Sequence, residues 1–204
     1  GRVSTGLKVA SSLDDASAFA VAQGIRAEVR ALDSVIQGLN NSKAVGKVAV
    51  AGATAVSNLM IDIRQKLTEL ANSSISTAQR TIIQRDFTEL VSQAANFVSN
   101  ATYNGFALLT SDSTNVNTLS NLGGSQLTLT AQTNVKLFIN SLAAATTTTA
   151  VNAQSVIVGQ FTDLQTSVAQ ALGTLGAEVR ALDLQTSFLE ELRDTTTIGL
   201  GNIV

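Results

Sequence analysis

Apolar residues recur every three or four positions through most of the first seventy residues, which is the spacing of one face of an α-helix. The apolar positions first follow a heptad-like seam. After a polar patch the seam resumes with its positions shifted by one residue, because the apolar stripe of a straight helix with 3.6 residues per turn drifts against a seven-residue repeat. The seam consists of Ile25, Val29, Leu32, Ile36 and Leu39, followed by Val45, Val48, Gly52, Val56, Leu59, Ile63, Leu67 and Leu70. This pattern predicts one long helix, or two helices in line, from Asp14 to about Leu70.

Two further helices follow from the same periodicity. After a break at Asn72–Ser74, a second helix is predicted from about Ser76 to Val98, and Asn104-Gly105 belongs to the turn-forming residues that close it. The third is predicted from about Asn152 to Asp194. Its expected apolar face consists of Phe161, Leu164, Val168, Leu172, Leu175, Val179, Leu182, Leu189 and Leu192.

The middle of the chain differs in kind, because residues 113–135 carry no charge. Alternating apolar positions over Gln126–Thr130 and again over Val135–Asn140 predict a β-hairpin. The run Thr146–Thr149 is expected to be extended or to cap the next helix.

These elements predict a mainly α fold, in which long helices from both ends of the chain pack as an antiparallel rod or bundle with a small β-hairpin region. We expect a single domain with three zones: an N-terminal helical part at 1–110, a loop and hairpin region at 111–151, and a returning helix at 152–204.

Two local features bear on helix packing. The heptapeptide AEVRALD occurs at 27–33 and again at 177–183, so we expect both segments to solve the same packing problem. Gly24, Gly38 and Gly52 recur every fourteen residues, and each costs about 1 kcal/mol relative to Ala inside a helix. Close approach of another element would offset that cost.

The composition excludes many functions. The chain has no Pro, which permits long helices, and no Cys, His or Trp, which excludes disulfides, His- or Cys-based metal sites and Ser-His or Cys-His catalysis. A net charge of -2 argues against a nucleic-acid binder. No uninterrupted apolar run approaches the roughly 18 residues of a membrane span. We expect no cofactor, no metal, no membrane insertion and no catalysis.

Two charged groups are candidate sites. Asp14 and Asp15 at the predicted helix start suit capping and the helix dipole better than metal binding or acid–base chemistry. A discontinuous basic edge, formed by Arg26, Arg30, Lys43 and Lys47, could contact an anionic polymer, although exposed charge usually forms only a solvated face.

Two segments resemble conserved stretches of bacterial flagellin. Residues Ser4–Asp15, STGLKVASSLDD, are similar to the run that begins the family's long core helix. Residues Thr102–Leu109, TYNGFALL, resemble the stretch that follows its second helix. The last sixty residues resemble its returning C-terminal helix. The likeness covers essentially the whole chain, and it marks Asp14, Asp15, Asn104 and Gly105 as candidate structural or self-assembly residues.

The resemblance implies a secreted structural subunit of the flagellar filament whose partners are other flagellin subunits. It also implies that the family's extreme terminal segments, which form the inner tube of the filament, lie beyond this chain. An alternative within the family is a cell-surface homologue that binds acidic polysaccharide such as alginate, for which the basic edge is the candidate contact.

Overall fold

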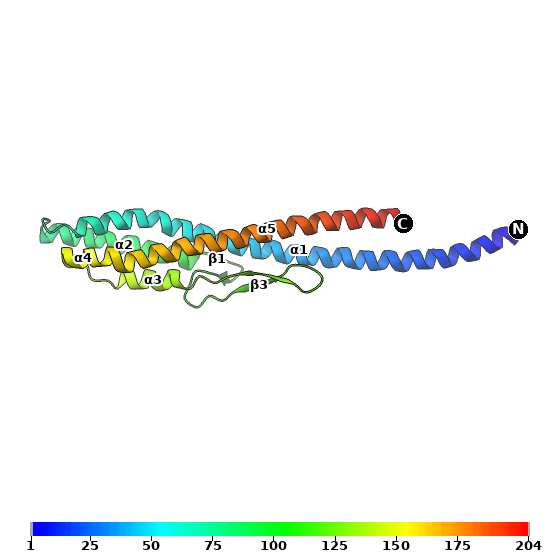
Figure 1. Cartoon of the computed structure of the whole chain (residues 1–204), viewed down its shortest axis with the longest axis horizontal. Helices are drawn as coiled ribbons and strands as arrows, with labels where there is room; N and C mark the ends of the chain where they lie inside the picture. Colours follow the sequence, from blue (N-terminus) through cyan, green and yellow to red (C-terminus); the bar gives the residue numbers. More distant parts are fainter. Residues whose placement is uncertain (1, 204) are drawn as a thin grey trace. The chain divides into compact units, whose positions relative to one another are not determined.

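The computed structural model describes the backbone of residues 2–203 and the side chains of residues 15–203. Long helices and two short strand pairs make up the fold, which confirms the expected mainly α class (Figure 1). In chain order the elements are α1 (Arg2–Leu70), α2 (Thr77–Asn100), β1 (Thr102–Tyr103), β2 (Phe106–Ala107), β3 (Val116–Leu119), β4 (Gln126–Leu129), α3 (Asn134–Ala143), α4 (Ala150–Val156), the π-helical turn η1 (Ile157–Phe161) and α5 (Thr162–Ile203).

The chain forms two compact units, and α1 and α5 contribute to both. Unit 1 contains the chain up to Asn41, residues 118–127 and the chain from Leu182 onward. Unit 2 contains residues 42–117 and 128–181. The three sequence zones remain a prediction about how the chain is organised.

Helix α1 begins at Arg2, so the expected start at Asp14 was wrong. Residues 2–13 contain no Pro, and the polar residues that suggested a cap are tolerated inside a helix. The expected seam is confirmed further along. Leu32, Ile36 and Leu39 are buried in unit 1, and Val56 and Ile63 are among the residues buried in unit 2.

The turn between α1 and α2 satisfies the polar groups at both helix ends. Ser76 caps α2 by accepting a hydrogen bond from the Gln79 backbone nitrogen, and the Gln79 side chain accepts from the Ser76 nitrogen in return. At the end of α1, Arg80 donates to the Leu70 carbonyl at 2.7 Å and to the Asn72 carbonyl at 3.0 Å. The predicted break and the second helix are thus confirmed.

The predicted hairpin was half right. Gln126–Leu129 is a strand, but it pairs with β3 before it in the sequence, and the short loop 120–125 makes the pair antiparallel. Val135–Asn140 is not a strand but lies in α3. The reason is packing: Val135, Ile139 and Leu142 are spaced by four and three residues, and all are buried on one helical face.

The returning helix is longer than expected and is interrupted once. Thr149 caps α4 by accepting a hydrogen bond from the Asn152 nitrogen, which confirms the capping role of the threonine run. Between α4 and α5, the turn η1 widens the helix, and the Thr162 hydroxyl donates to the Ile157 carbonyl at 2.7 Å. Helix α5 then continues to Ile203, past the predicted end at Asp194.

In unit 2, two glycines of α1 allow other parts of the chain to pack closely against this helix. A Cβ added at Gly52 would lie 2.7 Å from the Cβ of Ala101, and one at Gly46 would lie 2.5 Å from a methyl group of Val179. The predicted close approach is therefore confirmed at Gly52. It fails at Gly24, where nothing lies within 4 Å, and at Gly38, where an added Cβ would make only an ordinary contact with Thr118 at 3.9 Å. Gly46 supplies a second close approach that the fourteen-residue spacing missed.

One carboxylate joins α5 to the end of β4 in unit 2. Glu178 accepts hydrogen bonds from the Thr130 nitrogen at 2.9 Å and from the Thr130 hydroxyl at 2.7 Å. Its counterpart in the repeated heptapeptide, Glu28, is exposed. The two copies do share the expected packing of their apolar pair: Leu32 and Leu182 are buried, while Val29 and Val179 are half-buried.

Among the described residues, one helix is long and apolar enough to cross a membrane by length and composition alone. It is the Asp15–Leu70 part of α1, in which an 18-residue window has a mean hydropathy of 1.5. In this window 39% of the residues are buried within the protein. Core helices pass the same test, so the absence of membrane insertion stays a prediction.

Candidate functional site

The turn Asn104-Gly105 lies in unit 2 and has a well-defined backbone geometry. It joins β1 to β2 in an antiparallel hairpin in which Tyr103 lies opposite Phe106. Both turn residues have positive φ, 55° for Asn104 and 80° for Gly105, which is the geometry of a type I′ turn. Asn and Gly tolerate that conformation best, which explains this pair of residues at this position.

The hairpin presents aromatic side chains to solvent. Tyr103 is 40% exposed and Phe106 is 53% exposed. Phe97, near the end of α2, is also exposed. The TYNGF segment is thus a short hairpin that exposes two aromatic side chains.

Aromatic side chains are also exposed outside the hairpin. Of its seven Phe and one Tyr, only Phe87 and Phe161 are buried. The exposed aromatic residues are Phe19, Phe97, Tyr103, Phe106 and Phe188. Aromatic side chains dominate the energetics of protein interfaces, so this distribution is that of a chain with surfaces to cover.

In unit 1, helix α5 has an apolar stripe on its outer side. Leu184, Phe188 and Leu192 are spaced by four residues and are 67%, 57% and 40% exposed. Leu182 and Leu189, on the other side of the helix, are buried. A helix that is apolar on both sides is expected to be covered on both. Leu192, assigned to the buried seam by its spacing, lies on the exposed stripe instead.

An ion pair in unit 1 connects this helix to α1. The Arg193 guanidinium donates to Asp33 on α1 at 3.1 Å and to Asp194 at 3.2 Å. These hydrogen bonds, that to Asp33 first, raise the pKa of Arg193 above its ordinary value. An arginine is charged at physiological pH in any case, so this ion pair links α5 to α1 within unit 1 without adding a pH-dependent feature.

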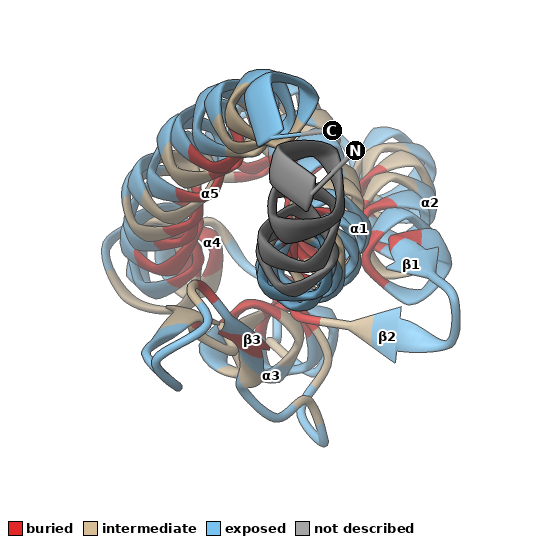
Figure 2. Cartoon of the chain, turned by 90° about the vertical axis from the view of Figure 1, so that its right-hand side faces the viewer, coloured by how far each residue is buried: buried red, intermediate tan, exposed pale blue. Residues whose placement is uncertain are grey.

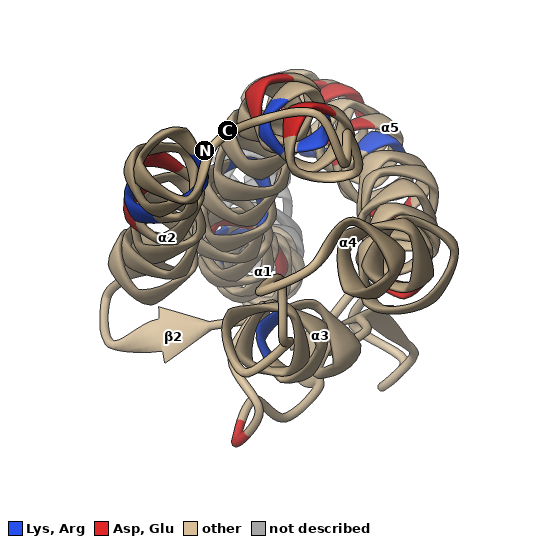
Figure 3. Cartoon of the chain, turned by 90° about the vertical axis from the view of Figure 1, so that its left-hand side faces the viewer, with Lys and Arg blue, Asp and Glu red and all other residues tan. Residues whose placement is uncertain are grey.

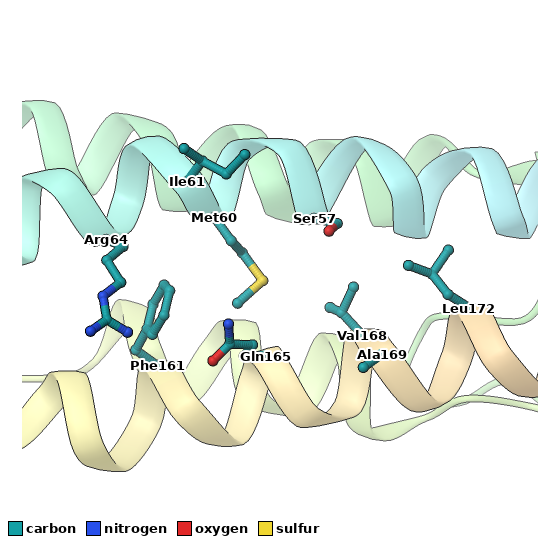
Figure 4. Close-up of a pocket in the computed structure, with 9 residues that line it drawn as sticks. All are labelled: Ser57, Met60, Ile61, Arg64, Phe161, Gln165, Val168, Ala169 and Leu172. Carbon is teal, nitrogen blue, oxygen red and sulfur yellow. The ribbon is translucent and has the colours of Figure 1, made fainter.

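Unit 2 contains a groove between α1 and α5 with a volume of about 490 Å³ (Figure 4). Met60, Ile61 and Arg64 line it from α1, and Phe161 and Gln165 line it from the opposite side. The Arg64 guanidinium lies 5.8 Å from the centre of the Phe161 ring. The groove is mainly apolar, with one cation and one amide at its edge.

The other candidate residues are less informative. Asp14 lies outside the residues whose side chains are described, and Asp15 is exposed within α1, one turn or more after the helix has begun. Arg26 donates to Gln23 at 2.8 Å and lines a hollow of about 270 Å³ with Arg30.

The basic edge is divided between the two units. Arg26 and Arg30 belong to unit 1, whereas Lys43 and Lys47 belong to unit 2. Lys43 is half-buried and has an interaction of its own. On the helices seen in Figure 3, acidic and basic positions are interspersed, most clearly on α2 and α5. The observations do not build these four residues into one site.

The described part of the chain contains no group of three or more His, Cys, Asp or Glu residues that could bind a metal ion. The features that remain are surfaces: the aromatic hairpin, the α5 stripe and the α1–α5 groove. The sequence predicted a turn at Asn104-Gly105 but not the two strands that this turn joins. The stripe and the groove were not predicted, although the four-residue spacing of Leu184, Phe188 and Leu192 was readable.

Comparison with known proteins supplies the context for these surfaces. Residues 1–114 match the family described as the bacterial flagellin N-terminal helical region. The chain is 30% identical to flagellin FljO of Caulobacter vibrioides over 206 residues, covering all of this chain and 74% of that protein. The chain belongs to the bacterial flagellin family.

Further comparisons agree. The chain is 26% identical over 214 residues to a flagellin of Brucella melitensis, covering all of this chain and 75% of that protein. The fold is similar to that of the Bacillus cereus flagellin crystal structure, with a TM-score of 0.67 at 16% identity, covering 74% of this chain and 88% of the other. Flagellins are secreted structural proteins that assemble into the extracellular flagellar filament. The surfaces of this flagellin therefore belong to a filament subunit.

Proposed function

We propose that this chain works as a structural subunit of the bacterial flagellar filament by packing its exposed apolar faces against further copies of itself. The observation that carries the proposal is the exposure of five of its eight aromatic side chains, two of them at the tip of a rigid hairpin. Burial of a large aromatic side chain between copies supplies the non-directional attraction that assembly needs.

In this proposal the candidate motif residues serve structure and assembly. Asn104 and Gly105 hold the turn that displays Tyr103 and Phe106. Asp14 and Asp15 belong to the segment that resembles the start of the family's core helix. The chain acts without catalysis, cofactor or metal, and its partners are other flagellin subunits.

The polysaccharide alternative gains no support from the structure or from the relatives. Its four basic residues are divided between two units, and Arg26 and Lys43 have interactions within the protein. The filament role therefore stands alone as the function that the observations favour.

The test is filament formation by this protein, expressed in a bacterium lacking its own flagellins and viewed by electron microscopy. We expect filaments from the unaltered protein. Changing Leu184, Phe188 and Leu192 together to Ser should shorten or abolish them, because the substitutions remove the apolar surface without touching the buried side of α5.

The matched control changes Ser187, Glu191 and Thr195 to Ala, three exposed polar residues of the same helix. Filaments of normal length should persist. Circular dichroism of both purified variants checks that helicity is retained. Absence of filaments from the unaltered protein would contradict the proposal, and so would filaments of normal length from the Ser variant.

A further inference from the structure

The hairpin tip and the α1–α5 groove are complementary features of the same unit. We infer that the tip formed by Tyr103 and Phe106 of one copy inserts into the groove beside Arg64 and Phe161 of a second copy. This inference rests on the proposed self-association and names the contact that would carry part of it.

Chemistry is the first argument for this occupant. The tip offers two exposed aromatic rings held rigidly by a type I′ turn, so little conformational entropy is lost when they are buried. The groove offers the apolar side chain of Ile61, which is 71% exposed, above the buried side chains of Met60 and Phe161. Its volume of about 490 Å³ lies within the range of sites that bury ligand-sized groups.

Electrostatics is the second argument. Arg64 is the charged residue of the groove lining, and its guanidinium already lies against the Phe161 ring. Its other face can stack on an incoming aromatic ring. Asp112 is the single charged residue of the sequence between Glu89 and Lys136, so the segment that bears the tip carries one negative charge and the groove one positive charge.

Position is the third argument. The hairpin lies on the α2 side of α1, whereas the groove lies on the α5 side (Figures 2 and 3). A copy therefore cannot fill its own groove with its own tip. Because donor and acceptor surfaces differ, the contact is heterologous, and each bound copy presents a new tip to the next. Repetition builds an open series of subunits, as a filament requires.

Chemical cross-linking between single-cysteine variants tests the contact, because the natural chain contains no Cys. One variant carries Thr102→Cys, beside the tip with both aromatic rings kept, and the other carries the nearly isosteric Ser57→Cys in the groove lining. The two are mixed with a short bis-maleimide. The control mixture pairs Thr102→Cys with Ser141→Cys, an exposed position on α3.

We expect the groove pair to give mixed dimers about tenfold faster than the control pair, the size of effect typical of one strong interface residue. Replacing Tyr103 and Phe106 by Ala should abolish that excess. So should Ala169→Trp, which fills the groove from an exposed position, whereas Ala181→Trp, exposed on the same helix, should leave it intact.

Equal rates for the two mixtures would overturn the inference, as would an excess that survives Ala169→Trp. Electron microscopy of filaments assembled from the same variants separates this result from the proposed function. Filaments that form normally with Ala169→Trp would leave the filament role standing and remove the tip-in-groove contact. Circular dichroism of each variant confirms that the helices are retained.

Discussion

Gly52 is the residue at which the packing of α1 depends most directly on the absence of a side chain. An added Cβ would lie 2.7 Å from the Ala101 Cβ, and a Cβ cannot move without its backbone. The Gly52→Ala substitution should therefore destabilise the protein by about 1–2 kcal/mol, since the overpacking exceeds the gain in helix propensity.

The control for this prediction is Gly173→Ala in α5. Gly173 is exposed and nothing lies within 4 Å of its added Cβ, so only the propensity gain of about 0.5–1 kcal/mol should remain. Urea unfolding, followed by circular dichroism at unchanged m-value, measures both. Shifts of the same sign for the two variants would contradict the assigned close approach.

Glu178 is the residue for which the chain provides its own control. Its carboxylate accepts hydrogen bonds from the nitrogen and the hydroxyl of Thr130, so Glu178→Ala should lower the free energy of unfolding by about 2 kcal/mol. Glu28 occupies the same place in the repeated heptapeptide but is exposed, and Glu28→Ala should change stability by less than about 0.5 kcal/mol. Equal losses, measured by urea unfolding, would show that the Thr130 contact contributes nothing.

Residues such as these mark the limit of inference from sequence. Two identical heptapeptides predict the same buried Leu, which the structure confirms at positions 32 and 182. The heptapeptides cannot predict that Glu178 accepts hydrogen bonds from the residue at the end of β4 while Glu28 is exposed to solvent. That difference comes from residues 48 positions away in the chain, and no local pattern reports it.

At the scale of elements, periodicity predicted the long helices because their buried faces extend over many turns. It failed at Val135–Asn140, where six residues fit both an alternating and a helical pattern. Packing decided for the helix, since Val135, Ile139 and Leu142 fill one buried face. The start of α1 was also missed, because the capping residues Asp14 and Asp15 occur inside α1 rather than before it.

The π-helical turn η1 gives a prediction at this scale. Its wider turn contains more residues than an α-helical turn, so removing one residue can restore regular helix without rotating α5 relative to α4. Deleting Val158, which is 76% exposed, should therefore lower stability by only about 1 kcal/mol.

Deleting Gln170, exposed within regular α5, is the comparison. It rotates the following segment by about 100°, withdraws buried Leu175 from its contacts and should cost more than about 3 kcal/mol. Thermal unfolding of the two deletion variants decides between these outcomes. If deleting Val158 lowers stability as much as deleting Gln170, then η1 does not contain an extra residue that the helix can lose without a change of register.

For the whole molecule, the family and the fold class were predictable because they rest on many residues at once. The surfaces for assembly were not, because exposure depends on which faces the other helices leave uncovered. Spacing alone placed both Leu189 and Leu192 in the buried seam. The packing of α1 against α5 in unit 1 buries Leu189 and leaves Leu192 exposed. The basic edge stays a prediction, and its four residues on one helix belong to two units.

The two units should also differ in stability. Unit 1 is built from one stretch each of α1 and α5 with residues 118–127, which contain parts of β3 and β4 and the loop between them. Unit 2 adds α2, α3 and α4 to its stretches of the same helices. Fewer packed elements mean easier local opening. We therefore predict that amides of residues 22–39 and 182–193 exchange with deuterium at least about tenfold faster than those of residues 56–67 and 164–175, as a difference of about 1.4 kcal/mol in opening free energy would give.

Assembly should reduce this difference in exchange rate, and that reduction links the difference to function. The outer stripe of Leu184, Phe188 and Leu192 lies in the weaker unit, so covering it with another copy should slow exchange most in 182–193. Hydrogen exchange followed by mass spectrometry on monomer and filament measures both states. Uniform protection in the monomer would contradict the first expectation. A gain on assembly that spares residues 182–193 would show that the stripe stays exposed in the filament and has no part in assembly.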